Sequence, residues 1–506
     1  MSNRTLTRRQ LVQSALALTA AGVVVGPLGT ARALAQPASS APTASRKPTP
    51  ATGFGPLVPV GSHLMLPAGF RYVRFDMAAH HDPERGIQVR PGDTMSDGAP
   101  VPGAHDGTGH FRRGRTVSLV RNHEMNPLVG DVYQGIDGTA GRRGYDPTGN
   151  GGVTISRFDL DRERATSSFV ALRGTIENCS GGMTPWGSWL SAEETTAGVG
   201  AGLEKPHGYV FEVPAWSDRE VEATPITAMG RFVHEAAGVD PRTGIVYMTE
   251  DNGDPFDGLY RYVPSRPGRL AAGGRLQMLA IVDQPNFSAA DAEVGTRYAC
   301  WWVDVDEPDP SDAEDDPAAV FSQGDAKGAM RFLGNEGGYF ADGSFVFTES
   351  DGGPDELGQV WRYTPCDTEG RDDDGPSRRR RRGGTLELVF RSPDDVTALN
   401  PDAVVTSPHG SVLFAEDGDG EDVDGVRPEY VKVVTGTDAI QPFCTSQVQL
   451  DIHLHNLTED PEDQLPVGAR GYSEFSGMGF VDDWMFCNLQ YPGETFAITG
   501  PWPRSI

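Results

Sequence analysis

Short apolar runs that end in acidic or amide residues recur along the chain, and each predicts a β-strand. The runs are rich in β-branched and aromatic residues and are bounded by Gly, Asp, Asn and Pro. They cover residues 115–124, 187–194, 244–251, 343–351, 410–417 and 483–490. A second run follows several of them, at residues 208–214, 258–264 and 358–365. Beyond the first 35 residues no helix-period pattern of useful length appears, which indicates an all-β protein.

The six runs form a degenerate repeat whose copies start roughly 57 to 99 residues apart. A strand, an acidic end, a Gly-rich loop and a second strand follow one another in the same order. This order is typical of propeller blades with insertions in their loops. We therefore expect an all-β β-propeller of about six blades, in which equivalent strand ends meet around one central axis. A β-sandwich with acidic turns is the alternative.

The N-terminal region has the three-part layout of a twin-arginine signal peptide. Arg8-Arg9 precedes an apolar run from Leu16 to Leu28, and Ala33-Leu34-Ala35 is a small-x-small cleavage pattern. The apolar run is too short to span a bilayer comfortably, and no later stretch is long and apolar enough. We expect export through the twin-arginine machinery to the periplasm or beyond, and no membrane span.

The rest of the chain divides by composition. We expect residues 1–35 to be the signal peptide and residues 36–52 to be a disordered Pro/Ala/Ser linker. Residues 53–506 are expected to form a single propeller domain. Its loops carry an acidic insertion near residues 304–316 and an acidic and arginine-rich insertion near residues 367–384.

Charge and cysteine content narrow the function classes. The chain has 43 Lys and Arg against 71 Asp and Glu, a net charge of −28. Such a field repels nucleic acid and anionic lipid and favours multivalent cations. The five cysteines include no CxxC pair, which excludes zinc-ribbon and thioredoxin-like sites. Because their number is odd, at least one thiol of an exported protein stays unpaired.

The acidic residues occupy the same phase of the repeat, at the strand ends. We expect them to converge at one mouth of the propeller, where their repulsion requires cations or protonation. Asp251-Asn252-Gly253-Asp254 and Asp417-Gly418-Asp419-Gly420 resemble flexible calcium-binding loops without EF-hand spacing. The convergent acids are Glu124, Glu194, Glu250, Asp251, Asp351, Glu416 and Asp417.

Two further segments carry candidate ligands. Cys179 lies in a polar, glycine-bearing loop, Glu177–Gly187, whereas a structural cysteine normally lies among apolar residues. A thiolate ligand to a transition metal is the sharper interpretation. His234 and Glu235 stand together before the third run; we expect Glu235 to bind a metal and His234 to position it.

These segments resemble the signature of the PhoX-type alkaline phosphatases. The resemblance is carried by Glu177–Gly187 with Glu193-Glu194, by Gly230–Glu235 with Thr249–Asp251, and by the closing run Gln490–Trp502. It spans roughly residues 60–506. It implies a propeller with two ferric and three calcium ions, one cysteine among the iron ligands, and hydrolysis of small phosphate monoesters outside the cytoplasm. We expect a monomer.

The resemblance also implies roles for individual residues. Cys179, Glu194 and Glu235 fall on motif positions that correspond to iron ligands. The remaining strand-end acids and Glu336, the glutamate of the fourth motif, correspond to the calcium or iron shell. Asn488, at the end of the sixth run, is the candidate that completes a phosphate clamp.

The chain departs from the family pattern at one position. Related sequences place an arginine two residues before the glutamate of the fourth motif, whereas Gly334 stands there in this chain. Arg331 lies nearby as a candidate replacement. Loss of a phosphate donor would remove about 2–4 kcal/mol of transition-state binding, by analogy with oxyanion donors.

Two other functions are compatible with the same pattern. One is a calcium-dependent propeller hydrolase of another class, such as a lactonase, which needs no thiolate. The other is a non-catalytic propeller whose metals are structural. Replacement of Cys179 distinguishes all three.

Overall fold

The computed structural model describes residues 53–82, 87–128, 134–253, 255–370, 382–417, 428–436, 439–451 and 470–503. The proposed signal peptide and linker therefore lie outside the described residues, as do most of the arginine-rich insertion and part of the second calcium-like loop. Within the described part of the chain, no helix is long and apolar enough to cross a membrane.

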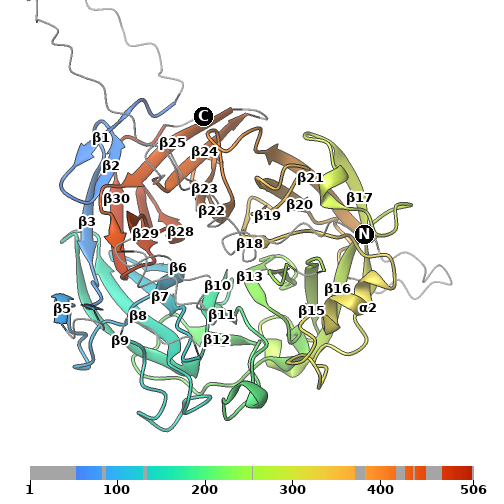
Figure 1. Cartoon of the computed structure of the whole chain (residues 1–506), viewed down its shortest axis with the longest axis horizontal. Coiled ribbons are helices and arrows are strands. Elements are labelled where there is room, and N and C mark those ends of the chain that lie inside the picture. Colours follow the sequence, from blue (N-terminus) through green and yellow to red (C-terminus); the bar gives the residue numbers. More distant parts are fainter. Residues whose placement is uncertain are drawn as a thin grey trace, which may run out of the picture.

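The strands form six blades around a central axis, as Figure 1 shows. The sequence-based prediction of a six-bladed propeller is confirmed. Each blade is antiparallel, with its first strand next to the axis. The first three blades contain β6 (His105–Arg113), β7 (Thr116–His123), β8 (Gly151–Asp159) and β9 (Arg164–Thr175); β10 (Asn178–Met183), β11 (Ser188–Glu193) and β12 (Val210–Pro214); and β13 (His234–Val239), β14 (Val246–Glu250), β15 (Leu259–Pro264) and β16 (Gly274–Ile281).

The other three blades follow the same plan, and β17 (Arg297–Asp304) joins the outer edges of blades 3 and 4 into one sheet. They contain β18 (Asn335–Ala341), β19 (Ser344–Glu349), β20 (Gln359–Thr364) and β21 (Arg382–Arg391); β22 (Pro401–Thr406), β23 (Val412–Glu416), β24 (Tyr430–Gly436) and β25 (Ala439–Ser446) with β2 (Leu64–Pro67) and β1 (Leu57–Val60); and β28 (Phe475–Val481), β29 (Trp484–Leu489), β30 (Glu494–Thr499) and β3 (Arg71–Phe75).

Short elements complete the described part. They are β4 (His80–Asp82), β5 (Ile87–Arg90), β26 (Leu450–Asp451), β27 (Arg470–Gly471), the helix α2 (Ala319–Asp325), and 3-10 turns at Val199–Ala201, Thr227–Met229, Leu270–Ala272 and Ala289–Asp291.

The ring closes between strands from opposite ends of the chain. β3 pairs antiparallel with β30, from Arg71 opposite Thr499 to Phe75 opposite Thr495. In a propeller such a strand completes the last blade and joins the two ends of the chain. Blade 6 is therefore built from both ends of the chain.

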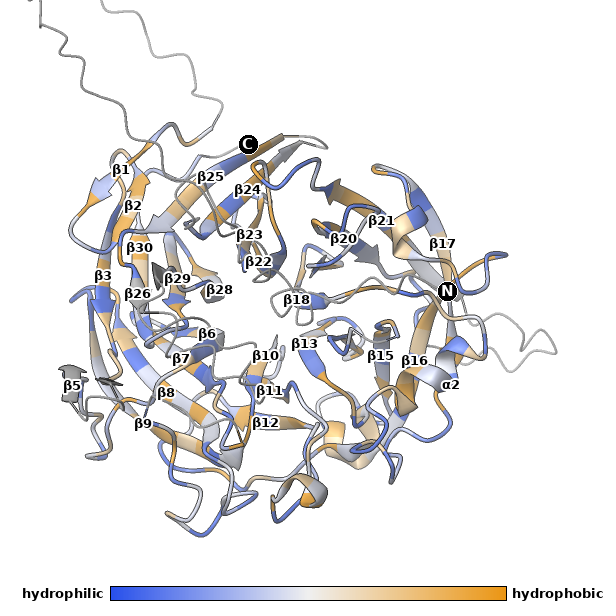
Figure 2. Cartoon of the chain, in the orientation of Figure 1, coloured by the Kyte–Doolittle hydropathy of each residue, from blue (hydrophilic) through white to orange (hydrophobic). Residues whose placement is uncertain are grey.

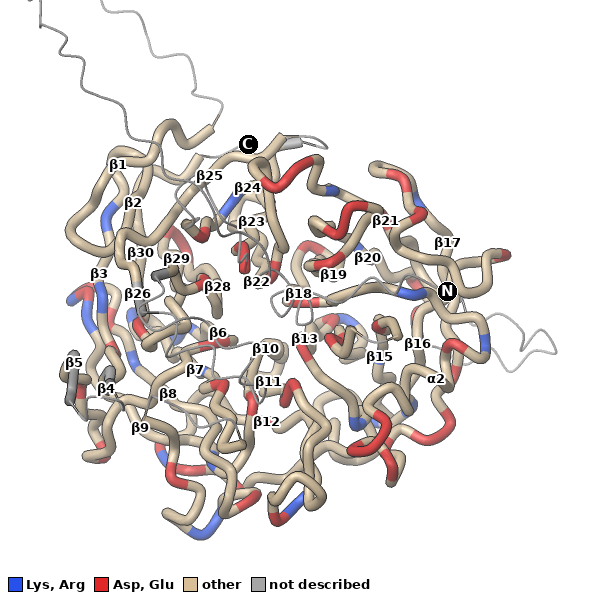
Figure 3. Tube along the Cα trace, viewed as in Figure 1, with Lys and Arg blue, Asp and Glu red and all other residues tan. Residues whose placement is uncertain are grey.

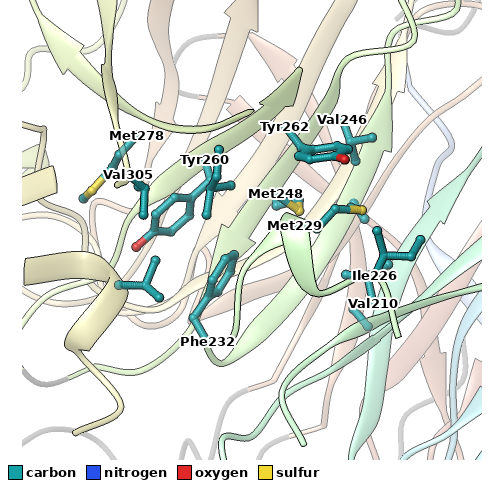
Figure 4. Close-up of a cluster of buried hydrophobic side chains, with 14 of the residues drawn as sticks. Val210, Ile226, Met229, Phe232, Val246, Met248, Tyr260, Tyr262, Met278 and Val305 are labelled. Carbon is teal, nitrogen blue, oxygen red and sulfur yellow. The ribbon is translucent and has the colours of Figure 1, made fainter. Parts of the chain in front are cut away.

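Apolar side chains fill the space between neighbouring blades. Figure 2 shows hydrophobic positions recurring along the strands of each blade. The cluster in Figure 4 combines Val210 of blade 2 with Met248 and Tyr260 of blade 3, all of them buried. Each Å² of apolar surface removed from water stabilises such an interface by about 25 cal/mol. The packing therefore holds neighbouring blades together.

The acidic insertion at residues 304–316 packs against the loop that follows β11. The backbone N–H of Ala201 donates to Glu314 Oε1 at 2.9 Å, and the N–H of Arg231 donates to the carbonyl of Pro308 at 2.8 Å. The insertion thus braces the segment that begins at Glu194.

Candidate metal centre

Every inner strand is interrupted by a β-bulge near its start. Two residues of the inner strand face one residue of the second strand there, and a bulge of this kind changes the direction in which a side chain points. The register shifts lie between His105 and Thr108, Asn178 and Gly181, His234 and Ala237, Asn335 and Gly338, Pro401 and Val404, and Ser476 and Gly479. The first bulged residues are Asp106, Cys179, Glu235, Glu336, Asp402 and Gly477.

The residue after each ligand position is small because the inner strands nearly touch. A Cβ on Gly107 would lie 2.6 Å from Ser180 Cα, and one on Gly337 would lie 2.9 Å from Ala403 Cα. Backbone hydrogen bonds fix the same region, since Asn122 Nδ2 donates to the carbonyl of Cys179 at 2.9 Å. Five blades thereby present an acid or a thiol towards the axis.

Four groups of possible ligand atoms form, and they share members. In each group the ligand atoms lie within 4.8 Å of one another. Cys179 and Glu235 are buried, whereas Asp417 is exposed, so the site runs from the interior of the ring to solvent. Figure 3 shows acidic positions around the centre of the ring. The groups are Asp106–Glu124–Cys179, Cys179–Glu194–Glu235, Glu235–Glu336–Asp402 and Asp402–Asp417–Glu474.

Without cations these acids oppose one another. Burial, and then the neighbouring Asp106 and Glu235, raises the pKa of the Cys179 thiol well above its ordinary value. Burial, followed by repulsion from Glu194, does the same to the pKa of Glu235. Burial, followed by repulsion from Asp251 and Asp402, raises the pKa of Glu336.

The donor atoms fit bound cations. Cys179 Sγ donates to Glu235 Oε1 at 2.8 Å, and Glu235 Oε2 is buried without a hydrogen-bond partner among the described residues. A buried carboxylate oxygen left in this way costs free energy unless a cation or proton meets it. Sulfur with carboxylates suits a transition metal, and the all-oxygen groups suit calcium.

Six sequence-predicted ligands are brought together in the four groups. They are Glu124, Cys179, Glu194, Glu235, Glu336 and Asp417. Asp251 lies close enough to raise the pKa of Glu235 and Glu336, although it belongs to none of the groups. Asp351 accepts a hydrogen bond from Asn400 Nδ2 at 3.1 Å and also stays outside them.

The structure does not place Glu250 and Glu416 among these groups. Glu250 Oε2 accepts from the N–H of Gly258 at 2.9 Å and from Tyr260 Oη at 2.7 Å. Glu416 Oε1 accepts from the N–H of Leu399 at 2.8 Å and pairs with Lys432 Nζ at 2.7 Å. Both carboxylates are engaged within their own blades and belong to none of the four groups, so their binding of metal stays a prediction.

The two predicted phosphate-binding residues are engaged elsewhere. Arg331 Nε donates to Asp325 Oδ1 at 2.7 Å, and its guanidinium lies 5.2 Å from the centre of the Phe256 ring. Asn488 is buried beside the site, where Nδ2 donates to the carbonyl of Asp106 at 2.8 Å and Oδ1 accepts from Thr495. Asn488 therefore links blade 6 to the ligand of blade 1, and its amide is already used.

His234 packs against Phe232 and contacts the backbone, and its role in positioning Glu235 stays a prediction. Its ring lies 3.6 Å from the Phe232 ring, centre to centre, and Nε2 lies 3.1 Å from the carbonyl oxygen of Gly230. Burial lowers its pKa to about 3, so the imidazole is neutral at physiological pH.

Sequence reasoning missed Asp106, Asp402 and Glu474. Asp106 and Asp402 stand on inner strands that lack the apolar alternation of ordinary strands, as in His105-Asp106-Gly107. A signal was nevertheless present: an acid or cysteine followed by Gly, Ala or Ser precedes five of the six apolar runs. Glu474 directly precedes β28 and gave no such signal.

The fold and the site define a β-propeller with a central group of potential metal ligands. The chain belongs to the PhoX family of alkaline phosphatases, since the family model described as alkaline phosphatase PhoX matches residues 157–493. The resemblance seen in the sequence is thus confirmed.

One solved structure agrees with this fold. The chain is similar to PhoX of Pseudomonas fluorescens in complex with vanadate, a transition state analogue, with 15% identity and a TM-score of 0.57, over 88% of this chain and 97% of that chain. It also matches a luciferin-regenerating enzyme (8% identity, TM-score 0.38, over 80% and 93% of the two chains), a likeness too weak to carry an argument. No curated protein sequence matches the chain.

Proposed function

We propose that this protein is an exported phosphomonoesterase that uses ferric and calcium ions held at the propeller axis. The observation that carries the proposal is the central position of Cys179, which belongs to two ligand groups at once. A thiol shared between carboxylate groups fits neighbouring cations, one of them a transition metal. Membership of a phosphatase family supplies the reaction class.

The candidate ligands fall into two sets, one for iron and one for calcium. Cys179, Glu194 and Glu235 would hold iron, together with Asp106 and Glu124 on the other side of the sulfur. Glu336, Asp402, Asp417 and Glu474 offer only oxygen and would hold calcium, with Asp251 beside them. When bound, such ions supply positive charge to phosphoryl oxygens and lower the pKa of an oxygen nucleophile.

The first role of the protein's own residues is to take the proton from Cys179. Cys179 Sγ shares its proton with Glu235 Oε1, and loss of that proton turns the sulfur into a thiolate ligand. The most exposed group, Asp402–Asp417–Glu474, marks the side from which a substrate approaches. Arg331 pairs with Asp325, and Asn488 donates to the carbonyl of Asp106, so both side chains are engaged away from a bound phosphate. Cations held by the four groups would supply the positive charge that a phosphate needs.

The twin-arginine pattern at Arg8-Arg9 supports export to the periplasm or beyond, and phosphate esters are the expected substrates. The lactonase-like and non-catalytic alternatives differ in what Cys179 does. In a calcium-only hydrolase the sulfur has no metal to bind. In a structural site no phosphate is released.

Replacement of Cys179 by Ala tests the proposal, with Cys444→Ala as the control. Cys444 is also buried, but it lies in the apolar cluster of blades 5 and 6. We expect Cys179→Ala to lose iron, the absorption band of a thiolate–ferric pair, and at least 100-fold of p-nitrophenyl phosphate hydrolysis. The control should keep all three. Fully metallated wild-type protein that releases no phosphate from a panel of monoesters would exclude the proposal.

A further inference from the structure

We infer that Glu349 and Glu416, with Glu193 at the equivalent place, position the metal-ligating bulges of their blades and bind no cation themselves. The inference rests on the proposed metal site. We call these three residues the clamp glutamates. Each is the last residue of the second strand in its blade.

The clamp glutamates occupy one structural position. Glu193 lies opposite Asn178, Glu349 opposite Asn335 and Glu416 opposite Pro401. In each case the partner is the first residue of the inner strand, directly before the ligand. All three glutamates are buried, with at most 1% of their surface exposed.

Each clamp glutamate accepts a hydrogen bond from the same place in the backbone. The donor is the N–H two residues before the inner strand: Ile176 at 3.1 Å for Glu193, Leu333 at 2.9 Å for Glu349, and Leu399 at 2.8 Å for Glu416. A threefold repeat of one side chain-to-backbone contact indicates a common function of this position.

The contact fixes the turn that leads into the ligand. In all three blades the residue between the bonded N–H and the inner strand is left-handed, with φ of 44° at Glu177, 63° at Gly334 and 43° at Asn400. The ligands Cys179, Glu336 and Asp402 follow two residues later. The turn is fixed on one side by this hydrogen bond and on the other side by strand pairing. Together the two contacts restrict the conformation of the bulge.

The carboxylates also anchor this turn to the body of the blade. Glu193 Oε2 accepts from the N–H of Gly208 at 3.0 Å, and Glu349 Oε2 accepts from Trp361 Nε1 at 2.8 Å. Blade 1 makes the same contact with opposite polarity. His123 stands at the clamp position, and its Nδ1 lies 2.8 Å from the carbonyl oxygen of Gly103, two residues before β6.

Glu349 gives the sharpest test, because one of its hydrogen bonds comes from Trp361 and can be removed without changing Glu349 itself. Glu349→Leu removes both acceptors, and Trp361→Phe removes one donor without touching the site. Trp302→Phe is the matched control, since Trp302 lies in the same apolar cluster and donates to Tyr363 Oη at 3.1 Å. Glu212→Leu is the second control, because Glu212 accepts from Trp186 Nε1 at the far end of β11.

The measurement is calcium titration of chelator-treated full-length protein by calorimetry, beside the melting temperature of the metal-free state. We expect Glu349→Leu and Trp361→Phe to raise the calcium dissociation constant by about 10-fold or more, as loss of groups that orient ligands does. The two controls should lower the melting temperature alone. A merely structural role predicts no difference in affinity between the test variants and the controls.

Three results are decisive. Equal calcium affinity in Trp361→Phe and Trp302→Phe overturns the inference. Loss of one whole ion in Glu349→Leu, with wild-type binding in Trp361→Phe, also overturns it and makes Glu349 a ligand. Wild-type protein that binds no calcium refutes the proposed metal site instead, so the two failures are distinguishable.

Discussion

An added side chain at Gly334 would clash with a neighbouring serine. Gly334 has a φ of +63°, and an added Cβ would lie 2.2 Å from Ser350 Oγ. Its N–H donates to Asp257 Oδ2 at 2.6 Å. An arginine here, which the resemblance to the family implies, would therefore require Ser350 to move. Phosphate recognition in this chain cannot come from this position as it is folded.

Replacement of Gly334 by Ala should be more costly than replacement of Gly343. Gly343 also has a left-handed backbone, with φ of +77°, but nothing lies within 4 Å of its added Cβ. Alanine in that conformation costs about 1–2 kcal/mol. The clash at Gly334 should add about 1–3 kcal/mol. Chemical denaturation measures both variants, and equal losses would contradict the steric argument.

The membership of the four groups was predictable from the sequence in part. Cys179, Glu235 and Glu336 were identified because polar loops and the family motifs mark them. Glu250 and Glu416 fall outside the four groups because successive strand residues point to opposite sides. The sequence does not reveal which of two adjacent acids faces the axis. Only the bulges, which change that direction, settle the choice.

At the level of elements, the strands away from the axis follow the sequence pattern closely. The run at residues 115–124 becomes β7, and the run at 343–351 becomes β19. The inner strands escaped prediction because they line the axis and pack against one another. Small residues there replace the β-branched residues that ordinarily mark a strand.

The end of β3 is held by a buried ion pair. Asp76 directly follows β3 and lies 3.3 Å from Arg121 of blade 1, whose side chain is 1% exposed. Arg121 also donates to Thr495 Oγ1 at 2.6 Å on β30. The pair thereby fastens the closing strand both to its own blade and to the next one.

Asp76→Asn should destabilise the closed ring far more than Glu163→Gln. The first variant leaves the buried Arg121 without its counter-charge, which costs about 3–5 kcal/mol. Glu163 pairs with Arg71, the first residue of β3. This pair is exposed, since 51% of the arginine side chain and 38% of the glutamate side chain are accessible to solvent. Loss of such a pair costs about 0–1 kcal/mol. Urea denaturation of both variants at neutral pH tests this difference, and similar midpoints would show that Asp76 does not anchor the ring.

For the whole molecule, the buried acids link stability to pH. Burial raises the pKa of Glu250 and of Glu349 to about 8, against about 4.5 in the unfolded chain. Between these values the folded protein binds more protons than the unfolded chain. The stability that these groups contribute is therefore fully present below pH 4.5 and is lost as the pH rises through 8.

The metal-free protein should consequently unfold more easily as the pH rises from about 5 to 8. Each unit by which the folded and unfolded pKa values differ corresponds to about 1.4 kcal/mol. Added calcium should reduce the loss, because cations favour the ionised carboxylates. Thermal unfolding with chelator and with calcium measures the effect. A chelated protein that grows more stable over this range would contradict the assignment.

The closure of the ring also sets an order of events during biosynthesis. Asp106 and Glu124 are made early, yet Asn488 holds the carbonyl of Asp106 and Gln490 Nε2 donates to Glu124 Oε2 at 2.5 Å. Both amides belong to the last blade. A nascent chain on the ribosome therefore lacks a finished first ligand group until almost every residue has been translated. We expect a chain truncated before β30 neither to close the ring nor to hold Asp106 and Glu124 in place as the first ligand group.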